Sequence, residues 1–322
     1  MNPETRMEKI IHDSYGNTAG IAVRKDGKII YEKYLNGYTA ADSVHIASVT
    51  KSIVSALIGI AIEKGDIKSV DQKVLDFFPD YKVARGEKTI QNITLKDMLT
   101  MTAPYKCKTE PYEKVFKSDS WLMPALDLLG GKGKIGEFRY SPIVGTHILS
   151  GMLVNATGQS VLDFARENLF SPLEIKGMKN IVLEDKEAQL AFLKDKNANG
   201  WVVDPEGINT AGWGLTLTAL DMAKIGQLYL DQGMWNGQRI LAKSWVEEST
   251  KEHSRWDKLS YGYLWWIIDE KEHAFAALGD GGNVIYVNSK KNLVISMASL
   301  FIKDAKDRIK LIRNYMEPVF AS

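Results

Sequence analysis

The chain has 322 residues, of which 45% are hydrophobic and 25% are charged, and its formal net charge is +1. This composition indicates one large or two ordinary globular domains. It excludes general disorder, a basic surface for nucleic acid and an acidic tail. The single cysteine, Cys107, excludes an internal disulfide and a thiolate metal cluster, so the fold must depend on packing.

The N-terminal residues contain acidic side chains and no apolar core of a signal peptide. The longest apolar stretch, Ile53–Ile62, has ten residues, whereas a membrane span needs about twenty. We therefore expect a cytoplasmic protein without a membrane span, unless the sequence is a trimmed form of an exported one.

Strand and helix signals open the chain. Thr18–Arg24 and Lys28–Leu35 are β-rich runs joined by a turn that contains Asp26-Gly27, which predicts a hairpin. A helix is predicted from about Ser48 to Lys64, because its apolar residues recur at helical spacing, and Gly65 is a suitable stop.

The middle of the chain is mostly helical in pattern to about residue 199. Capping boxes begin helices at Thr94, at Ser160 and, further on, at Thr218. Lys186–Gly200 is expected to be a long surface loop.

The last quarter returns to strands and ends with an amphipathic helix over about residues 305–316. The predicted strands are β-branched or aromatic and are spaced like an antiparallel meander. They are Tyr261–Ile268, Ala274–Leu278, Val284–Asn288 and Leu293–Ser299.

Strands at both ends of the chain with helices between them predict an α+β fold. We expect an antiparallel sheet built from the two chain ends and flanked by helices, plus a mostly helical region. The predicted domains are a sheet domain of residues 1–75 and 201–322 and a helical domain of residues 76–200.

One short motif can carry chemistry. Ser48 and Lys51 form an S-x-x-K pattern at the start of the long helix, so both side chains lie on one helix face. The helix N-terminus favours a developing oxyanion at Ser48, and burial would let Lys51 act as a base. On this tetrapeptide alone, a capping serine followed by a solvated lysine is an equally good interpretation.

Other motifs are absent from the sequence. There is no G-x-S-x-G, H-E-x-x-H, Walker A or G-x-G-x-x-G motif. The histidines are scattered, and none is paired at the spacing of metal ligands. We therefore expect structural or surface histidines and no metal or other cofactor. The five histidines are His12, His45, His147, His253 and His273.

Several motifs in order resemble one family. The segment from Ala47 to Gly65 resembles the nucleophile helix of the serine β-lactamase and penicillin-binding-protein superfamily. It is most like the branch with class C β-lactamases, carboxylesterases and 6-aminohexanoate-dimer hydrolases. The resemblance runs from about residue 18 to residue 300 and implies the β-lactamase/transpeptidase-like fold. The further matching segments are Ile93–Thr102, Phe138–Pro142, Gly212–Lys224 and Gly279–Asn283.

The resemblance implies a set of catalytic residues. Ser48 would be the acylating nucleophile, Lys51 its proton partner and Tyr140 the second member of the acid/base pair. Without the family context, a buried aromatic is the better interpretation of Tyr140. The backbone N–H groups of Ser48 and Asn283 would form the oxyanion hole.

The substrate cleft is expected to involve the glycine-rich segment and a tryptophan. Asp280, Gly281, Gly282 and Trp213 are the candidate substrate-binding residues, and the alternative interpretation of the glycines is a plain turn between two strands. Of the tryptophans that could line the cleft, at least two are expected in the core instead. These tryptophans are Trp201, Trp213, Trp265 and Trp266.

Two residues depart from the family pattern. Pro142 replaces the usual Asn of Y-x-N, and Asp280 replaces the Lys or His of the third motif. A carboxylate at position 280 repels a substrate carboxylate and favours neutral or amine-bearing substrates. Both changes weigh against β-lactams and D-Ala-D-Ala peptides as good substrates.

The function expected from these residues is that of a serine hydrolase acting on a small ester, amide or lactam through a Ser48 acyl-enzyme. No nucleic-acid partner is expected. A true β-lactamase or DD-peptidase is one alternative. A catalytically decayed binding protein on the same scaffold is another, from a different functional class.

Overall fold

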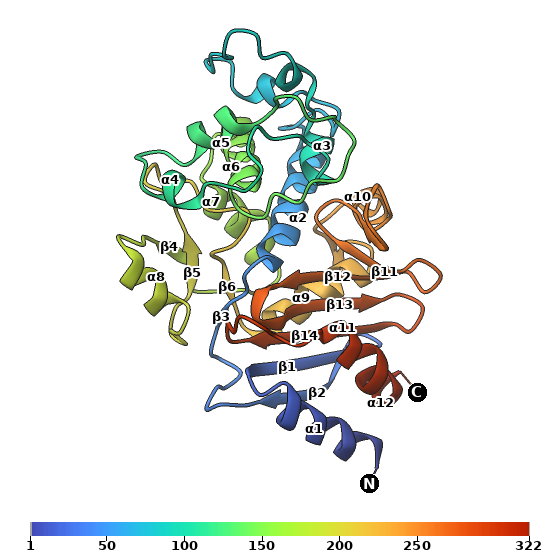
Figure 1. Ribbon diagram of the computed structural model, residues 1–322. Helices are drawn as coiled ribbons and strands as arrows, with labels where there is room; N and C mark the ends of the chain where they lie inside the picture. The colour runs from blue at the N-terminus through green and yellow to red at the C-terminus, as the bar shows by residue number, and fades with distance from the viewer. Residues whose placement is uncertain (1, 322) are drawn as a thin grey trace.

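The computed structural model describes residues 2–321 and contains an eight-stranded antiparallel sheet in the order β2-β1-β14-β13-β12-β11-β10-β9. N-terminal and C-terminal strands lie side by side in it (Figure 1), which confirms the predicted sheet and the α+β fold class. The strands are β1 (Thr18–Lys25), β2 (Lys28–Tyr34), β9 (Ser254–Trp256), β10 (Leu259–Tyr261), β11 (Trp266–Asp269), β12 (Ala274–Gly279), β13 (Asn283–Asn288) and β14 (Leu293–Ser299).

Helices cover both faces of this sheet, because alternate strand residues are apolar on each side. α2 (Val49–Lys64) and α9 (Ala219–Leu230) pack on one face, where Ala22 and Ile285 point. α1 (Pro3–Ser14), α11 (Arg308–Leu311) and α12 (Glu317–Phe320) cover the other face, where Ile21 and Tyr286 point. The sheet is therefore buried on both sides.

α2 is the central helix of the molecule (Figure 1) and leads from the sheet into the helical region. It is buried from Val49 to Ala61, because it packs against β12 on one side and against α6 (Val144–Thr157) on another. Gly65 ends it in a left-handed conformation with φ 84°, as the sequence predicts. Its N-terminal end lies beside the sheet.

The remaining elements are short. The helices are α3 (Leu95–Leu99), α4 (Tyr112–Phe116), α5 (Leu122–Leu128), α7 (Val161–Ala165), α8 (Lys186–Phe192) and α10 (Lys243–Ser249). Single turns are η1 (Val74–Phe77), η2 (Thr89–Asn92), η3 (Arg166–Phe170), η4 (Asp280–Gly282) and η5 (Ile312–Met316). Two-stranded pairs are β3 (Val44–His45) with β6 (Thr216–Leu217), β4 (Lys179–Ile181) with β5 (Gly200–Val202), and β7 (Met234–Trp235) with β8 (Gln238–Arg239).

Three local predictions need correction, and one helix was missed. α1 was not predicted, although Asn2 caps it and Pro3 begins it. The predicted loop 186–200 contains α8, which Asp185 caps. The predicted strand 261–268 is interrupted because Leu264 has φ 63°, so β10 and β11 are separate. The final helix begins at Arg308 instead of residue 305, because Asp307 caps it, and it includes the wider turn η5.

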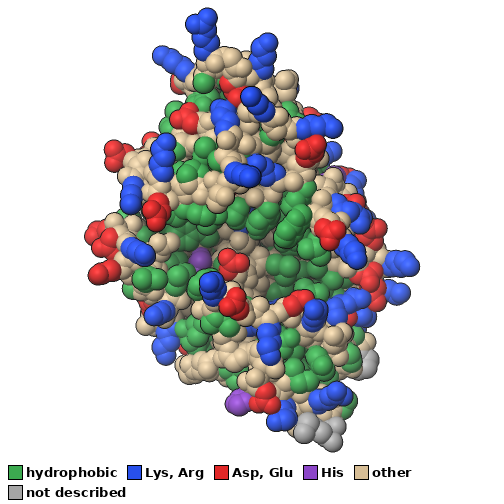
Figure 2. Space-filling view, viewed as in Figure 1, with side chains coloured by type: hydrophobic (Ala, Val, Ile, Leu, Met, Phe, Trp, Pro, Cys, Tyr) green, Lys and Arg blue, Asp and Glu red, His purple; other side chains and the backbone are tan. Residues whose placement is uncertain are grey.

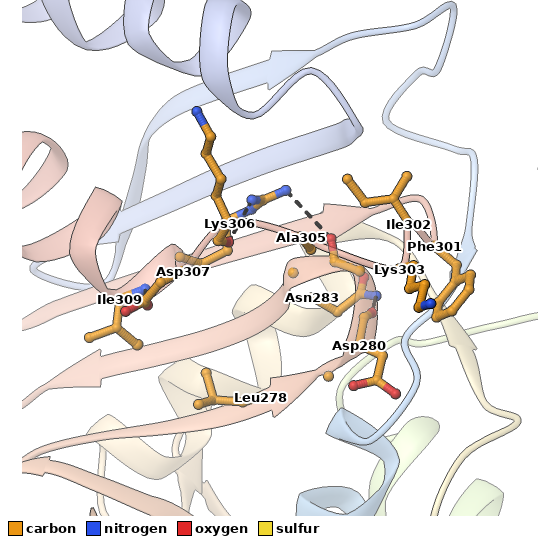
Figure 3. Close-up of a pocket in the computed structure, with 14 residues that line it drawn as sticks. Leu278, Asp280, Asn283, Phe301, Ile302, Lys303, Ala305, Lys306, Asp307 and Ile309 are labelled. Atoms are coloured by element: carbon orange, nitrogen blue, oxygen red, sulfur yellow. Dashed lines mark hydrogen bonds between the residues drawn. The ribbon is translucent and has the colours of Figure 1, made fainter.

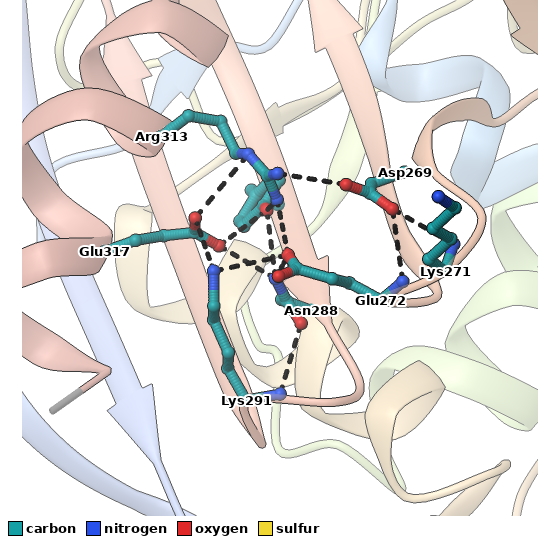
Figure 4. A network of polar contacts seen from close by, with 8 residues as sticks. Asp269, Lys271, Glu272, Asn288, Lys291, Arg313 and Glu317 are labelled. Carbon is teal, nitrogen blue, oxygen red and sulfur yellow. Dashed lines mark hydrogen bonds and ion pairs between the residues drawn. The ribbon is translucent and has the colours of Figure 1, made fainter.

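A polar network fastens the C-terminal helices to the sheet (Figure 4). Arg313 binds Asp269 and Glu272, and Lys291 binds Glu272 and Glu317. The network closes the end of the sheet where β11–β12 and β13–β14 turn. Among residues 2–321, no helix combines the length and the apolar character that crossing a membrane requires.

Candidate active site

Ser48 lies in the tight turn between β3 and α2. Ala47 just before it has φ 49°, a left-handed conformation that is costly for a residue with a side chain. Ser48 stands at the N-cap of α2, yet its hydroxyl makes no capping hydrogen bond. Among the described residues, none accepts a hydrogen bond from its backbone N–H. The interpretation of Ser48 as an ordinary capping serine therefore does not fit the structure.

Lys51 is directed at Ser48. Its Nζ donates to Ser48 Oγ at 2.6 Å and to the carbonyl oxygen of Gly212 at 3.1 Å. The side chain is only 2% exposed, so it is not a solvated lysine. Within residues 2–321, no carboxylate lies within ion-pair distance of it. The serine hydroxyl is therefore one of the few groups that can exchange a proton with Lys51.

Tyr140 is the third residue of the group. The Nζ of Lys51 lies 5.3 Å from the centre of the Tyr140 ring, and this ring lies 6.1 Å from that of Trp266. Tyr140 is partly exposed rather than buried. The structure therefore brings Ser48, Lys51 and Tyr140 together from two separate segments.

Glu110 fixes the segment that carries Tyr140, although no sequence pattern predicts this role for it. Its carboxylate accepts a hydrogen bond from the hydroxyl of Ser141. It also accepts three backbone hydrogen bonds at the start of α6, where the helix dipole favours an anion. These bonds come from Ile143, Val144 and Gly145, each at 3.2 Å.

Pro142 packs against the residue that holds Lys51. A side chain on Gly212 would place its Cβ 2.2 Å from the carbonyl oxygen of Pro142, so only glycine fits there. The carbonyl oxygen of Gly212 in turn accepts from Lys51. The carbonyl oxygen of Gly212 therefore binds Lys51 beside Pro142, the residue that replaces the family asparagine.

Gly279, at the end of β12, lies against the Ser48 turn. A Cβ on this glycine would be 2.3 Å from the carbonyl oxygen of Ile46 and 3.2 Å from the backbone nitrogen of Ser48. The buried side chain of Asn283 braces the hairpin instead: it donates to the carbonyl oxygens of His45 and Asp280. The backbone beside the Ser48 turn thus belongs to Gly279.

The two other glycines of this segment face the C-terminal part of the chain. A Cβ on Gly281 would meet the backbone of Leu300, and one on Gly282 would meet the guanidinium group of Arg308. They border a pocket of about 380 Å³ between this turn and residues 301–309, from which the Asp280 carboxylate points away toward α2 (Figure 3).

At least two of the four tryptophans lie in the core, as predicted. Trp201 and Trp265 are fully buried in the core. Trp266 contacts Tyr140, whereas Trp213 is almost buried and its ring lies 5.9 Å from both His45 and Phe116. Trp266, rather than the candidate Trp213, is therefore the tryptophan beside Tyr140, whereas its neighbour Trp265 lies in the core.

Acidic and phenolic side chains lie close together around Tyr140. Burial, with the charges of Glu110, Tyr140 and Asp280, raises the pKa of Tyr112 to about 12. Tyr112 and Glu110 also line a pocket of about 360 Å³ next to Tyr140. The Asp280 carboxylate and Tyr140 therefore both act electrostatically on the hydroxyl of Tyr112.

Two histidines lie near these elements: His147 is buried and His45 is half-buried. Burial lowers the pKa of His45 to about 4, and its Nε2 accepts a hydrogen bond from the N–H of Gly214 at 2.9 Å. His147 Nε2 lies 3.0 Å from the carboxylate of Asp204. In the described part of the chain, no three histidine, cysteine or acidic side chains form a group that could hold a metal ion.

The comparisons with known proteins define the family. A Beta-lactamase family model matches residues 8–315, so the chain belongs to the β-lactamase family. The 6-aminohexanoate-dimer hydrolase of Paenarthrobacter ureafaciens is 23% identical over 315 residues, which cover 91% of this chain and 73% of that protein. The chain is thus related to a hydrolase and is serine hydrolase-like in general.

Solved structures share the fold. The octameric penicillin-binding protein homologue from Pyrococcus abyssi aligns with a TM-score of 0.70 and 20% identity, over 98% of this chain and 77% of that one. A family VIII carboxylesterase aligns with a TM-score of 0.71 and 15% identity, over 98% of this chain and 96% of that one. These likenesses confirm the β-lactamase/transpeptidase-like fold.

Proposed function

We propose that this chain is a serine hydrolase that cleaves an ester or amide bond through an acyl-enzyme on Ser48. The observation that carries the proposal is the 2.6 Å contact from Lys51 Nζ to Ser48 Oγ at the N-terminus of α2. A serine hydroxyl is a weak nucleophile until an adjacent base takes its proton, and a buried amine in direct contact is such a base.

The reaction divides into two steps. In the first, Ser48 Oγ bonds to the substrate carbonyl carbon, its proton passes to the Lys51–Tyr140 pair, and the leaving alcohol or amine departs with a proton from that pair. In the second, water loses a proton to the same pair and adds to the acyl carbon, and Ser48 leaves with a proton returned. Substrate plus water thus gives an acid plus an alcohol or amine.

The oxyanion hole in this proposal uses the backbone N–H groups of Ser48 and Asp280. The close approach of Gly279 to the Ser48 turn supports this choice, because the N–H of Asp280 is the next one along the chain. Asn283 then acts through its side chain, which holds Asp280 and the β3 strand. This assignment replaces Asn283 as the second donor.

The charge of Asp280 favours neutral or amine-bearing substrates over carboxylate-bearing ones. Hydrolysis of an amine-tailed and a carboxylate-tailed ester with the same leaving group tests this preference, and faster turnover of the carboxylate-tailed ester contradicts it. Turnover of a chromogenic cephalosporin at a comparable rate would instead support the β-lactamase alternative.

A fluorophosphonate probe tests the nucleophile directly, because it bonds covalently to an activated serine hydroxyl. Mass spectrometry of the digested protein is expected to find the adduct on Ser48 and on no other serine. The Ser52→Ala variant, altered on the next turn of α2, is a matched control and should still be labelled. An unlabelled protein, or an adduct elsewhere, would favour the decayed binding scaffold.

A further inference from the structure

A row of aromatic rings leads away from Tyr140. The Tyr140 ring lies 6.1 Å from Trp266, and Trp266 lies 6.5 Å from Phe138 and 6.4 Å from Trp256. Phe138 and Trp256 are stacked at 6.4 Å with an angle of 9° between their planes. Tyr261 supports the row from below, 4.6 Å from Trp266. We call these five side chains the aromatic face.

The outer end of the aromatic face is open to solvent. Trp256 is 56% exposed, and Leu259 on the same hairpin is 49% exposed, whereas Tyr261 beneath them is buried. Burial of apolar surface stabilises by about 25 cal/mol for each Å², and surface that stays in water lacks this stabilisation. Contiguous exposed apolar surface is a feature of interaction sites and ligand-binding grooves.

The hairpin that carries Trp256 is held in place. Arg255 and the hydroxyl of Ser260 both bind the carboxylate of Glu252 on one side of the hairpin. Successive strand residues point to opposite sides, so Trp256 is on the other side. Ser254, on that same side, donates to the carbonyl oxygen of Thr100 at 2.6 Å. The Trp256 ring is therefore fixed on the side that faces the helical region.

The location of the aromatic face beside Tyr140 indicates which part of a substrate reaches it. In the proposed reaction, the leaving group takes its proton from the Lys51–Tyr140 pair and therefore departs on the Tyr140 side. The aromatic face begins at that ring and continues outward. Hydrophobic side chains also surround the hollow on the face of the molecule shown in Figure 2.

We propose that the aromatic face is a leaving-group subsite, which binds the aryl or other bulky apolar alcohol or amine part of the substrate. This inference rests on the proposed hydrolase function. The occupant is the apolar group attached to the scissile oxygen or nitrogen, because ring-on-ring contact with Trp256 and Trp266 is available only on that side of the carbonyl.

A matched pair of esters tests this proposal. Methyl butyrate and 2-phenylethyl butyrate share an acyl group and have unactivated leaving groups, and kcat/KM reports the step in which the leaving group departs. Trp256→Ala is expected to lower kcat/KM for 2-phenylethyl butyrate about tenfold and to change that for methyl butyrate less than about twofold. Trp256→Phe, which keeps a ring, should retain most of the preference.

Ile30→Ala is the matched control, because Ile30 is 46% exposed on β2, at the opposite edge of the sheet from β9. It should leave both rates unchanged. Equal loss on both esters, or no loss on either, would overturn the subsite. Loss of self-association in Trp256→Ala, seen by size-exclusion chromatography without a change in the ester preference, would assign the face to contact between copies and also overturn it.

Failure of the subsite is distinguishable from failure of the proposed function. Ser48→Ala must abolish hydrolysis of both esters if the function is right, whatever Trp256→Ala does to their ratio. The melting temperature of each variant, measured alongside, shows whether a rate change comes from unfolding.

Discussion

Lys51 Nζ lies 2.6 Å from Ser48 Oγ, one turn further along the same helix, and the lysine is buried whereas Ser48 is half-buried. The lysine has a second partner in the carbonyl oxygen of Gly212. Because a backbone carbonyl can only accept, it orients the lysine without taking part in proton exchange. The carbonyl oxygen of Gly212 thus orients Lys51 toward Ser48, although the family asparagine is missing.

Lys51→Met should lower kcat for p-nitrophenyl butyrate by about 10²–10⁴-fold, the usual loss when a general acid/base group is removed. The methionine keeps the volume but cannot take the Ser48 proton. Lys64→Met, in the exposed last turn of the same helix, is the control and should keep full activity. Unchanged turnover in Lys51→Met would mean that another group activates Ser48.

Gly279→Ala should lower kcat/KM by about 10²-fold or more, because the new Cβ would be 2.3 Å from the carbonyl oxygen of Ile46 and must displace the Ser48 turn. Gly16→Ala is the matched control, since its Cβ would meet only the carbonyl oxygen of His12, at an ordinary 3.6 Å. Full activity in Gly279→Ala would show that the oxyanion donors do not depend on this contact.

The stability of the protein should fall as the pH drops from about 6.5 to about 4, partly through His45. Its pKa is about 4 in the folded chain against 6.5 for an unperturbed histidine, because burial disfavours the charged form. Between these values, the unfolded chain binds a proton that the folded chain does not. The contribution of His45 to the free energy of unfolding therefore decreases by about 3 kcal/mol, and this contribution stops changing below about pH 4.

Urea denaturation at pH 7.5 and pH 4.5 measures this effect. In His45→Gln, the side-chain oxygen still accepts from Gly214 but does not titrate, so the decrease should be smaller than in the wild type. Burial also lowers the pKa of His253 and His273, and both variants share that contribution. Equal decreases in the two proteins would contradict the role given to His45.

Glu272→Gln should destabilise the C-terminal end of the sheet by about 1–3 kcal/mol at neutral pH. Hydrogen bonds from Asn288, Arg313 and Lys291 lower the pKa of Glu272 to about 2. Its contribution is therefore present above about pH 4.5 and is lost as the pH falls toward 2.

The difference in unfolding free energy between wild type and Glu272→Gln should accordingly narrow between pH 5 and pH 3. Glu270→Gln, an exposed neighbour, should change stability by less than about 0.5 kcal/mol. A Glu272→Gln effect that does not depend on pH would show that the network in Figure 4 stabilises by shape rather than by charge.

Features that depend on residues close in sequence could be predicted from the chain. The S-x-x-K pair is readable because residues three apart share a helix face, and the bounds of β14 and the end of α2 follow from local patterns. Glu110 could not be predicted, because its partners at Ser141 and beyond lie about thirty residues away and only the fold brings them together. The same holds for the carbonyl of Gly212.

Backbone geometry accounts for the other differences. The left-handed conformation of Leu264 divides a continuous β pattern into two strands, and no residue type signals it. The choice between Asn283 and Asp280 as oxyanion donor likewise depends on how closely Gly279 approaches Ser48, a distance that a glycine-rich motif does not specify. The division into two domains stays a prediction.

The most direct test of the central claim is p-nitrophenyl butyrate turnover by wild type and Ser48→Ala, measured side by side. The wild type is expected to hydrolyse the ester, and the variant, with an unchanged melting temperature, is expected to lose this turnover to background. Equal turnover in the two proteins would contradict the assignment of Ser48 as the nucleophile.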